Sequence, residues 1–383
     1  MIANPIPATF MRGGTSKGIF LHRSALPEDR SQWNGIFLGI MGSPDPVHGR
    51  QLNGMGGGIS SLSKICVVGP PSPDKLADGV HVEYTFVQVG IRDASIDYSG
   101  NCGNLSSMIG VYALDEGICK ASSDTVRDGR ATIRSFNTNT QKVIDTTFPV
   151  SDQGVADLDV PEATVAGVPG KASEIILDFV EPGGARTGRL LPTGSPSDMI
   201  DIPGLANSVR VSCVDATNPT IFVRQSDLEK ALPVSEYYNQ SPAAEQTVSP
   251  ILESLRQTCA VRMGLDPTAQ AQPKIALLAS PAGAADVDQG VDIVIHALSM
   301  GVLHKAVPMT VGLCLGVAAK ISGTIAWDIV HPTRTGAKSD DLTRIRHPGG
   351  YVDVGAKFDG DGSVLSAKVV RTGRRLMRGV VWW

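Results

Sequence analysis

The chain has 383 residues, of which 42% are hydrophobic and 19% are charged, and its formal net charge is −4. A chain of this length and composition is expected to form two domains with well-buried cores. The slightly negative charge offers no basic surface for nucleic acid or for a membrane, so we expect neither as a partner.

The cysteines, the histidines and the first residues of the chain indicate whether disulfides, a metal site or a targeting signal should be expected. The six cysteines are scattered without a C-x-x-C pair, and the seven histidines do not cluster with them. We therefore expect free thiols, no disulfide framework and no metal site. No apolar run approaches the length of a membrane span, and the first residues lack the pattern of a signal peptide, so a cytoplasmic location is expected.

Strand patterns dominate the first half of the chain, in keeping with its 42 glycines and 25 prolines. A polar turn at residues 13–18 joins two strands in the first predicted hairpin. Further strands are predicted at 63–68 and 81–91, and a second hairpin at 131–150. Between them, apolar residues from Leu105 to Leu114 recur at the spacing of one helical face, which predicts a buried helix.

A lone cysteine stands where this helix is predicted to begin. Cys102 lies between two glycines and two asparagines in the segment 99–104. The free backbone N–H groups and the positive dipole at a helix start favour a thiolate and attract a carboxylate. An inert, packed thiol is the alternative, but the Gly and Asn flanks argue against a core strand. The segment therefore offers a proton-transfer group and an anion-binding site.

Four segments of the first half return in the second half, in the same order and at an offset of about 200 to 212 residues. The pairs are 13–18 with 215–219, 19–26 with 221–228, 63–68 with 273–278, and Cys102 with Cys314, which lies in a second apolar helix predicted at 310–321. This repeat predicts two similar lobes. The turn-rich segment 181–188 separates them, so we expect lobes over 1–184 and 185–367.

Several motifs, taken in order, resemble the PrpF family. They are residues 10–18 (FMRGGTSKG), 41–45 (MGSPD), 51–57 (QLNGMGG), 61–64 (SLSK) and 99–104 (SGNCGN). That family comprises isomerases of unsaturated polycarboxylic acids, and its fold is similar to that of diaminopimelate epimerase. The resemblance implies an α+β fold of two pseudo-symmetric lobes, each a β-barrel-like sheet rolled around a central helix. It further implies an active site between the lobes, no metal or organic cofactor, and a final strand, 368–383, that pairs back into the first lobe.

The chemistry of such an isomerase sets requirements that the residues can be compared with. The enzyme must remove a proton next to an unsaturated carboxylate, hold the delocalised anion and return the proton, which takes a base, an acid and several carboxylate-binding groups. The resemblance implies that Lys64 and Cys102 are the acid/base pair, and it leaves open which of them abstracts first. Without the resemblance, Lys64 would be interpreted as a solvated strand end.

Candidate carboxylate-binding residues carry cationic, hydroxyl, amide or backbone donors. In the first half they are Arg12, Thr15, Ser16, Lys17, Gln51, Ser63, Asn101, Gly103 and Asn104. In the second half they are Thr193, Ser195, His304, Lys305 and Thr310.

Two other kinds of site are disfavoured by spacing. The turn at 13–18 lacks the spacing of a phosphate-binding loop, and residues 54–59 lack the final glycine of a dinucleotide fingerprint.

Cys314 lies in an apolar run without Asn and Gly flanks, so we expect a packed core thiol. A lysine and a cysteine from one lobe suit proton transfer along one face of an allylic system, which favours isomerisation over racemisation.

The sequence therefore predicts a cofactor-independent isomerase of an aconitate-type unsaturated tricarboxylic acid, acting by allylic proton abstraction and reprotonation through a cis/trans change or a double-bond shift. Three alternatives remain open: a 4-oxalomesaconate-type keto–enol tautomerase, an epimerase or racemase that uses Cys102 and Cys314, and a non-catalytic polycarboxylate-binding protein. The expected partner is a small polycarboxylate, and the apolar residues 380–383 leave a homodimer open.

Overall fold

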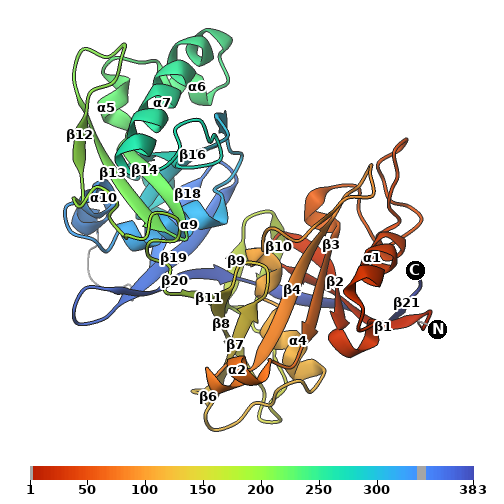
Figure 1. Cartoon of the computed structure of the whole chain (residues 1–383). Coiled ribbons are helices and arrows are strands. Elements are labelled where there is room, and N and C mark those ends of the chain that lie inside the picture. Colours follow the sequence, from red (N-terminus) through yellow and green to blue (C-terminus); the bar gives the residue numbers. More distant parts are fainter. Residues whose placement is uncertain (1–2, 334–341) are drawn as a thin grey trace. The chain divides into compact units, whose positions relative to one another are not determined.

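The computed structural model describes residues 3–333 and 342–383. The chain forms two compact units (Figure 1). Unit 1 comprises Met1–Val180 and Val370–Trp383, and unit 2 comprises Glu181–Val369. The divisions expected from the sequence were at residues 184 and 368.

Unit 1 is built mainly from strands that pair in the order β21-β1-β2-β3-β4-β7-β8-β11. The short strands β5 and β6 pair with β4 and β7, and β9 and β10 form a separate two-stranded sheet. The strands are β1 (Ile6–Gly13), β2 (Ser16–His22), β3 (Lys64–Gly69), β4 (Val82–Val89), β5 (Ile96–Asp97), β6 (Val126–Arg127), β7 (Arg130–Asn137), β8 (Lys142–Pro149), β9 (Ala163–Val165), β10 (Val168–Ala172), β11 (Ile175–Val180) and β21 (Gly373–Val381). The helices are α1 (Trp33–Met41), α2 (Pro73–Ala77), α3 (Gly103–Ser106) and α4 (Ile109–Asp115), with 3₁₀ turns at Arg23–Ala25, Arg30–Gln32 and Ser60–Leu62.

Unit 2 has strands in the order β12-β13-β14-β15-β16-β18-β19-β20. They are β12 (Asp198–Ile200), β13 (Val209–Ala216), β14 (Asn218–Arg224), β15 (Lys274–Ala279), β16 (Ile293–Ser299), β17 (Val302–Leu303), β18 (Leu342–His347), β19 (Gly350–Phe358) and β20 (Val364–Arg371), whose last two residues belong to unit 1. The helices are α5 (Gln225–Glu229), α6 (Val234–Tyr238), α7 (Pro242–Arg262), α8 (Ala284–Asp288), α9 (Met309–Ala318) and α10 (Ile325–Thr333).

The two units repeat one topology, which confirms the repeat found in the sequence. Each contains an antiparallel hairpin, β1–β2 in unit 1 and β13–β14 in unit 2, whose second strand pairs in parallel with the next strand of the sheet, β3 or β15. The repeat extends to register, because Ile19 lies opposite Ile65 and Ile221 lies opposite Ile275. In each unit an apolar helix packs against the sheet, α4 in the first and α9 in the second. The α+β fold class is therefore confirmed.

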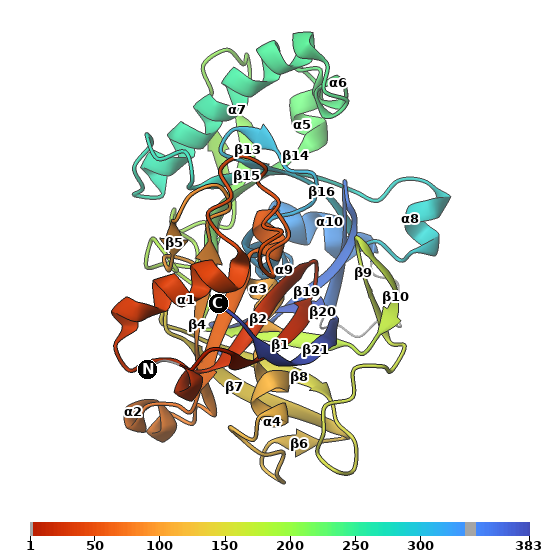
Figure 2. The ribbon, with the colours of Figure 1, turned by 90° about the vertical axis from the view of Figure 1, so that its right-hand side faces the viewer.

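The last strand, β21, completes unit 1 from the far end of the chain. It pairs antiparallel with β1, from Ile6 opposite Val381 to Gly13 opposite Gly373 (Figure 2). The first strand of the chain thus has the last strand on one side and β2 on the other.

The single helix expected over 105–114 is wrong, because the structure has two short helices there, α3 and α4. The Ser106 hydroxyl donates to the carbonyl of Cys102 at 3.0 Å, and the Ser107 hydroxyl donates to the carbonyl of Asn104 at 2.7 Å. Serine hydroxyls that bond nearby carbonyls compete with the helical hydrogen-bond pattern. The helix beginning beside Cys102 is therefore a single turn, and its dipole contributes less than a full helix would.

The central strands of unit 1 have two different faces, because successive side chains of a strand point in opposite directions. One face packs against α1 through an apolar cluster that includes Ile19, Ile65 and Val87. The opposite face, called the inner face below, carries Phe20, which packs against Tyr112 of α4 with ring centroids 5.6 Å apart. Cys66 lies opposite both Phe20 and Phe86 in register, so it belongs to the inner face.

Among the described residues, no helix has the length and apolarity needed to cross a membrane.

Candidate functional site

Lys64 is the first residue of β3 and is only 9% exposed. Its Nζ donates to Oε1 of Gln88 at 2.5 Å and lies 4.9 Å from the centroid of the Phe86 ring. The strand-end lysine is therefore buried rather than solvated. Its hydrogen-bond partner is the neutral amide of Gln88.

Gln88 was not singled out from the sequence, yet it orients Lys64. It lies directly opposite Lys64 in the antiparallel register of β3 and β4. Its Nε2 donates to the carbonyls of Ser63 at 3.0 Å and Ser60 at 3.1 Å. Because the amide nitrogen is held by two carbonyls, the amide oxygen must point toward the lysine.

The predicted binding residues Gln51 and Ser63 have side chains that bond within the protein. Both are completely buried. The Ser63 hydroxyl donates to Oε1 of Gln51 at 2.6 Å, and that oxygen also accepts from the backbone N–H of Gly58 at 3.0 Å. Nε2 of Gln51 donates to the Ser43 hydroxyl at 2.8 Å. The two residues thus hold the loop that precedes Lys64.

Cys102 lies at the N-terminal boundary of α3 in an extended conformation and is partly exposed. Its Sγ is 3.7 Å from the hydroxyl of Ser16 on β2. Beneath it, the Tyr84 hydroxyl bonds to the Ser106 hydroxyl at 2.8 Å and to Oδ1 of Asn101 at 3.2 Å. Asn101 is therefore engaged in supporting the Cys102 segment.

Cys66 connects the two proton-transfer candidates. Burial raises the pKa of the Cys66 thiol, the nearby Cys102 raises it further, and the Lys64 ammonium lowers it. Lys64 shares the inner face with Cys66, because the two residues stand two positions apart on β3. The structure brings both predicted acid/base residues to the inner face of unit 1.

Asn104 joins the first hairpin to the segment that follows Cys102. Its Nδ2 donates to the hydroxyls of Thr15 at 3.1 Å and Ser16 at 3.4 Å. Gly14 has a positive φ of 50°, and a Cβ there would overlap the Asn104 side chain. The glycine-rich turn therefore lets the hairpin backbone approach Asn104 closely. Gly103, also predicted, is the first residue of α3.

Arg371 is a residue that the sequence analysis missed. Its Nε donates to Oδ1 of Asn104 at 2.9 Å. Burial lowers the pKa of Arg371 to about 10, and the proximity of Cys102 opposes that shift. A cation thus lies in the same cluster as Cys102, Ser16 and Asn104, although 267 positions separate it from Asn104 in the chain.

The side chains of Arg12 and Lys17, unlike that of Ser16, make their contacts away from Cys102. They lie opposite each other in the β1–β2 register, and Lys17 Nζ is 5.6 Å from the ring centroid of Phe10. Ser16 precedes Lys17 on the strand, so the two side chains leave on opposite faces. Arg12 Nη1 donates to the carbonyls of Gly14 at 2.9 Å and Thr372 at 3.0 Å, which braces the turn.

The candidates of the second half all belong to unit 2. Thr193 donates to Oδ2 of Asp198 at 2.7 Å and accepts from the backbone N–H of Ser195 at 3.5 Å. Nδ1 of His304 accepts from the backbone N–H of Ala306 at 3.1 Å, which shapes the turn that contains Lys305. Thr310 lies in the first turn of α9, and its carbonyl accepts from the Thr217 hydroxyl at 2.9 Å.

Cys314, the repeat partner of Cys102, is completely buried in α9. Its Sγ is 3.5 Å from the carbonyl of Val214, and burial raises its pKa to about 12. The expectation of a packed core thiol is confirmed.

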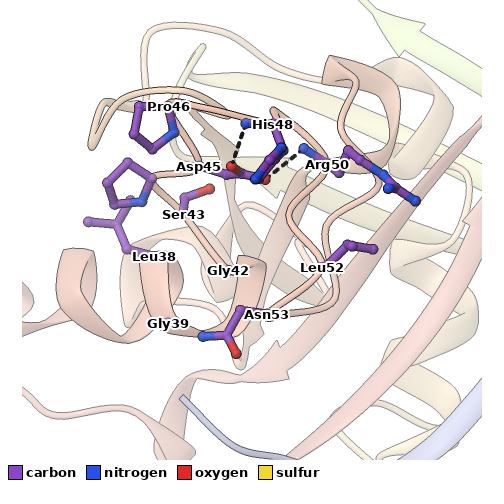
Figure 3. Close-up of a pocket in the computed structure, with 11 residues that line it drawn as sticks. Leu38, Gly39, Gly42, Ser43, Asp45, Pro46, His48, Arg50, Leu52 and Asn53 are labelled. Atoms are coloured by element: carbon purple, nitrogen blue, oxygen red, sulfur yellow. Dashed lines mark hydrogen bonds between the residues drawn. The ribbon is translucent and has the colours of Figure 1, made fainter.

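A cavity of about 510 Å³ lies beside the loop that carries Gln51 (Figure 3). It is lined by residues between Leu38 and Asn53, and neither Lys64 nor Cys102 is among them. Asp45 in its wall accepts from the backbone N–H groups of His48 at 3.0 Å and Arg50 at 2.8 Å, which lowers its pKa to about 2. Within residues 3–333 and 342–383, no three His, Cys, Asp or Glu side chains are grouped so that they could hold a metal ion.

Comparisons with known proteins identify the family. A family model described as PrpF protein matches residues 3–383. The chain is 36% identical to the 3-methylitaconate isomerase of Eubacterium barkeri, covering 98% of this chain and 97% of that one. It is 33% identical to the 2-methyl-aconitate isomerase of Shewanella oneidensis, covering 98% and 96%. The crystal structure of a methylitaconate-delta-isomerase superimposes with a TM-score of 0.84 at 35% identity, covering 99% and 95% of the two chains. The chain therefore belongs to the PrpF family and is an isomerase.

Proposed function

We propose that the chain isomerises an aconitate-type unsaturated tricarboxylic acid by removing an allylic proton and returning it to the same or another carbon. The observation that carries the proposal is the placement of Lys64 and Cys102 on one face of unit 1. Lys64 stands two positions before Cys66 on β3, and the Cys102 Sγ lies 3.7 Å from the hydroxyl of Ser16, four positions before Phe20 on β2. The relatives named as isomerases of methylitaconate and methylaconitate support this substrate class. The proposed chemistry uses side chains alone, without a metal or organic cofactor.

Lys64 and Cys102 are suited to opposite halves of a proton transfer. The Lys64 Nζ is buried and is held by the neutral amide of Gln88 beside the Phe86 ring. Cys102 is partly exposed, and its Sγ lies 3.7 Å from the Ser16 hydroxyl, which Asn104 links to the guanidinium of Arg371. In the proposal one group abstracts the proton and the other delivers it along the same face of the allylic system.

A two-cysteine epimerase or racemase is disfavoured by the surroundings of Cys314. Its thiol is completely buried, and its raised pKa keeps it protonated at neutral pH. A keto–enol tautomerase remains the second candidate, because the same acid/base pair serves that reaction and a relative 31% identical is named (4E)-oxalomesaconate Delta-isomerase, from Novosphingobium.

Proton NMR in deuterated water tests the proposal directly. The protein is incubated with cis-aconitate, trans-aconitate, 2-methylaconitate and 4-oxalomesaconate, and both new isomers and solvent exchange are followed. We expect exchange at an allylic carbon together with product formation. Binding of these acids without exchange or product would instead support the polycarboxylate-binding alternative.

Matched variants assign the acid/base roles. Lys64→Gln and Cys102→Ser are each expected to lower turnover by about 10²- to 10⁴-fold, the usual contribution of a positioned acid or base. The controls are Lys142→Gln, an exposed lysine at the start of β8, and Cys119→Ser, a partly buried thiol that belongs to unit 1. Wild-type turnover in Lys64→Gln would show that the assignment is wrong.

A further inference from the structure

Arg371 ends β20 and is a partly buried cation without an acidic partner. Among the described residues, no ion pair joins its guanidinium to an aspartate or glutamate. Its assigned bonds go to neutral oxygens, from Nε to Oδ1 of Asn104 at 2.9 Å and from Nη1 to the carbonyl of Val370 at 2.8 Å. Burying a cation without a counter-charge costs free energy, so a site of this kind favours an anion.

The unused donors of the guanidinium still form a pair that can bind a carboxylate. An arginine has five N–H donors, and the two bonds above occupy one on Nε and one on Nη1. The remaining donors lie on Nη1 and Nη2, and arginine commonly binds a carboxylate with two parallel hydrogen bonds from such a pair. Asn104 holds the Nε edge, which fixes the plane of the group.

The close packing around Arg371 also fixes its position relative to Cys102. A Cβ placed on Gly14 would lie 3.1 Å from Cδ of Arg371, so the arginine stem lies against the bare backbone of the hairpin turn. The Asn104 amide bridges the guanidinium to the hydroxyl of Ser16, which is 3.7 Å from the Cys102 sulfur. The cation, the two polar groups and the thiol form one connected cluster within unit 1.

We infer that Arg371 binds one carboxylate of the substrate beside Cys102, with Asn104 as the positioning residue that orients its guanidinium. The inference deepens the proposed function and rests on it for the identity of the ligand. Arg371 then supplies the counter-charge interaction that anchors the acid, while Cys102 is free to exchange a proton with the neighbouring carbon.

Alkylation of Cys102 tests this without any need for turnover. Iodoacetate carries a carboxylate and iodoacetamide does not, while both react with the same thiolate. The ratio of their rates at Cys102, read by mass spectrometry of the Cys102 peptide, cancels the fraction of thiolate and isolates the attraction of the carboxylate. Failure of the proposed function would show in the NMR assay and would leave this ratio unchanged.

We expect Arg371→Gln to lower the iodoacetate-to-iodoacetamide ratio at Cys102 by about tenfold or more, as for the loss of a charge-assisted pair of hydrogen bonds. Arg371→Lys keeps the charge without the paired donors and should fall between wild type and Arg371→Gln. The matched control is Arg374→Gln, which removes an exposed arginine three positions later and should leave the ratio within twofold. Added guanidinium ion should raise the ratio in Arg371→Gln only.

An unchanged ratio in folded Arg371→Gln, with its thermal midpoint close to that of the wild type, would overturn the inference. If Arg371→Gln does not fold, Arg371→Lys is the variant that tests the inference. A ratio in that variant equal to the wild-type value, with full affinity for tricarballylate by calorimetry, would overturn it equally.

Discussion

Replacing Gln88 by glutamate tests whether Lys64 acts through its uncharged amine. The change keeps the size of the side chain and places a carboxylate at the oxygen that lies 2.5 Å from the Lys64 Nζ. Coulomb attraction across that distance at an effective dielectric of about 20 is about 7 kcal/mol before desolvation of the new charge, which offsets a large part of it. A net stabilisation of the ammonium by about 1.4 to 4 kcal/mol moves the rate profile by about one to three pH units.

The assay is the dependence of kcat/KM on pH for the substrate identified by NMR. We expect the limb that requires the uncharged amine to move to higher pH, so that the rate at a fixed pH below it falls by about 10- to 1000-fold. The control is Gln246→Glu, an exposed position on α7. Because glutamate cannot donate to the carbonyls of Ser60 and Ser63 as Gln88 does, the thermal midpoint is measured alongside. A folded Gln88→Glu variant with an unshifted profile would refute the role of Lys64 as a base.

Three further predictions concern packing and titration. Gly18→Ala places a Cβ 2.6 Å from Cδ1 of Leu105 and 2.9 Å from the Lys64 carbonyl, so urea unfolding should show a loss of about 1–3 kcal/mol. Cys314→Ala should lower the free energy of unfolding by about 1–2 kcal/mol and leave kcat within twofold of wild type. A kcat reduced 100-fold would instead support an epimerase or racemase that uses both Cys102 and Cys314. Burial and Arg346 lower the pKa of His296 to about 4, so the protein should lose about 1–3 kcal/mol as pH falls from 6.5 to 4, since only the unfolded chain takes up that proton. His296→Phe, which keeps the ring stacked on Tyr238, should flatten this slope, and an equally steep slope would assign it to other groups.

The architecture could be predicted to a large extent because its signals are local or repeated. The first hairpin follows from alternating side chains around a glycine-rich turn, and the duplication shows as the same segments in the same order. The break between α3 and α4 could not be predicted, because apolar spacing continues through it. Two serine hydroxyls bond to nearby carbonyls at this point, and that bonding depends on their rotamers.

The candidate site could be predicted only in part. Lys64 and Cys102 come from motifs, and the structure places both on the inner face. Lys17 stands in the same motif as Ser16, but strand alternation sends its side chain to the other face. Gln88 and Arg371 carry no motif of their own. Gln88 meets Lys64 through the β3–β4 register, and Arg371 meets Asn104 only once the end of the chain has returned to unit 1.

The pairing of β21 with β1 delays the completion of the unit 1 sheet. Unit 2 is contiguous, so all its strands have been made before residues 370–383 leave the ribosome. β1 precedes unit 2 in the chain and β21 follows it, so the edge of β1 near Ile6 and Ala8 that β21 covers stays open while residues 181–369 are synthesised. Open strand edges in incomplete domains are where chains associate wrongly. The arrival of β21 therefore closes this edge of β1 and removes a strand edge with which other chains could pair.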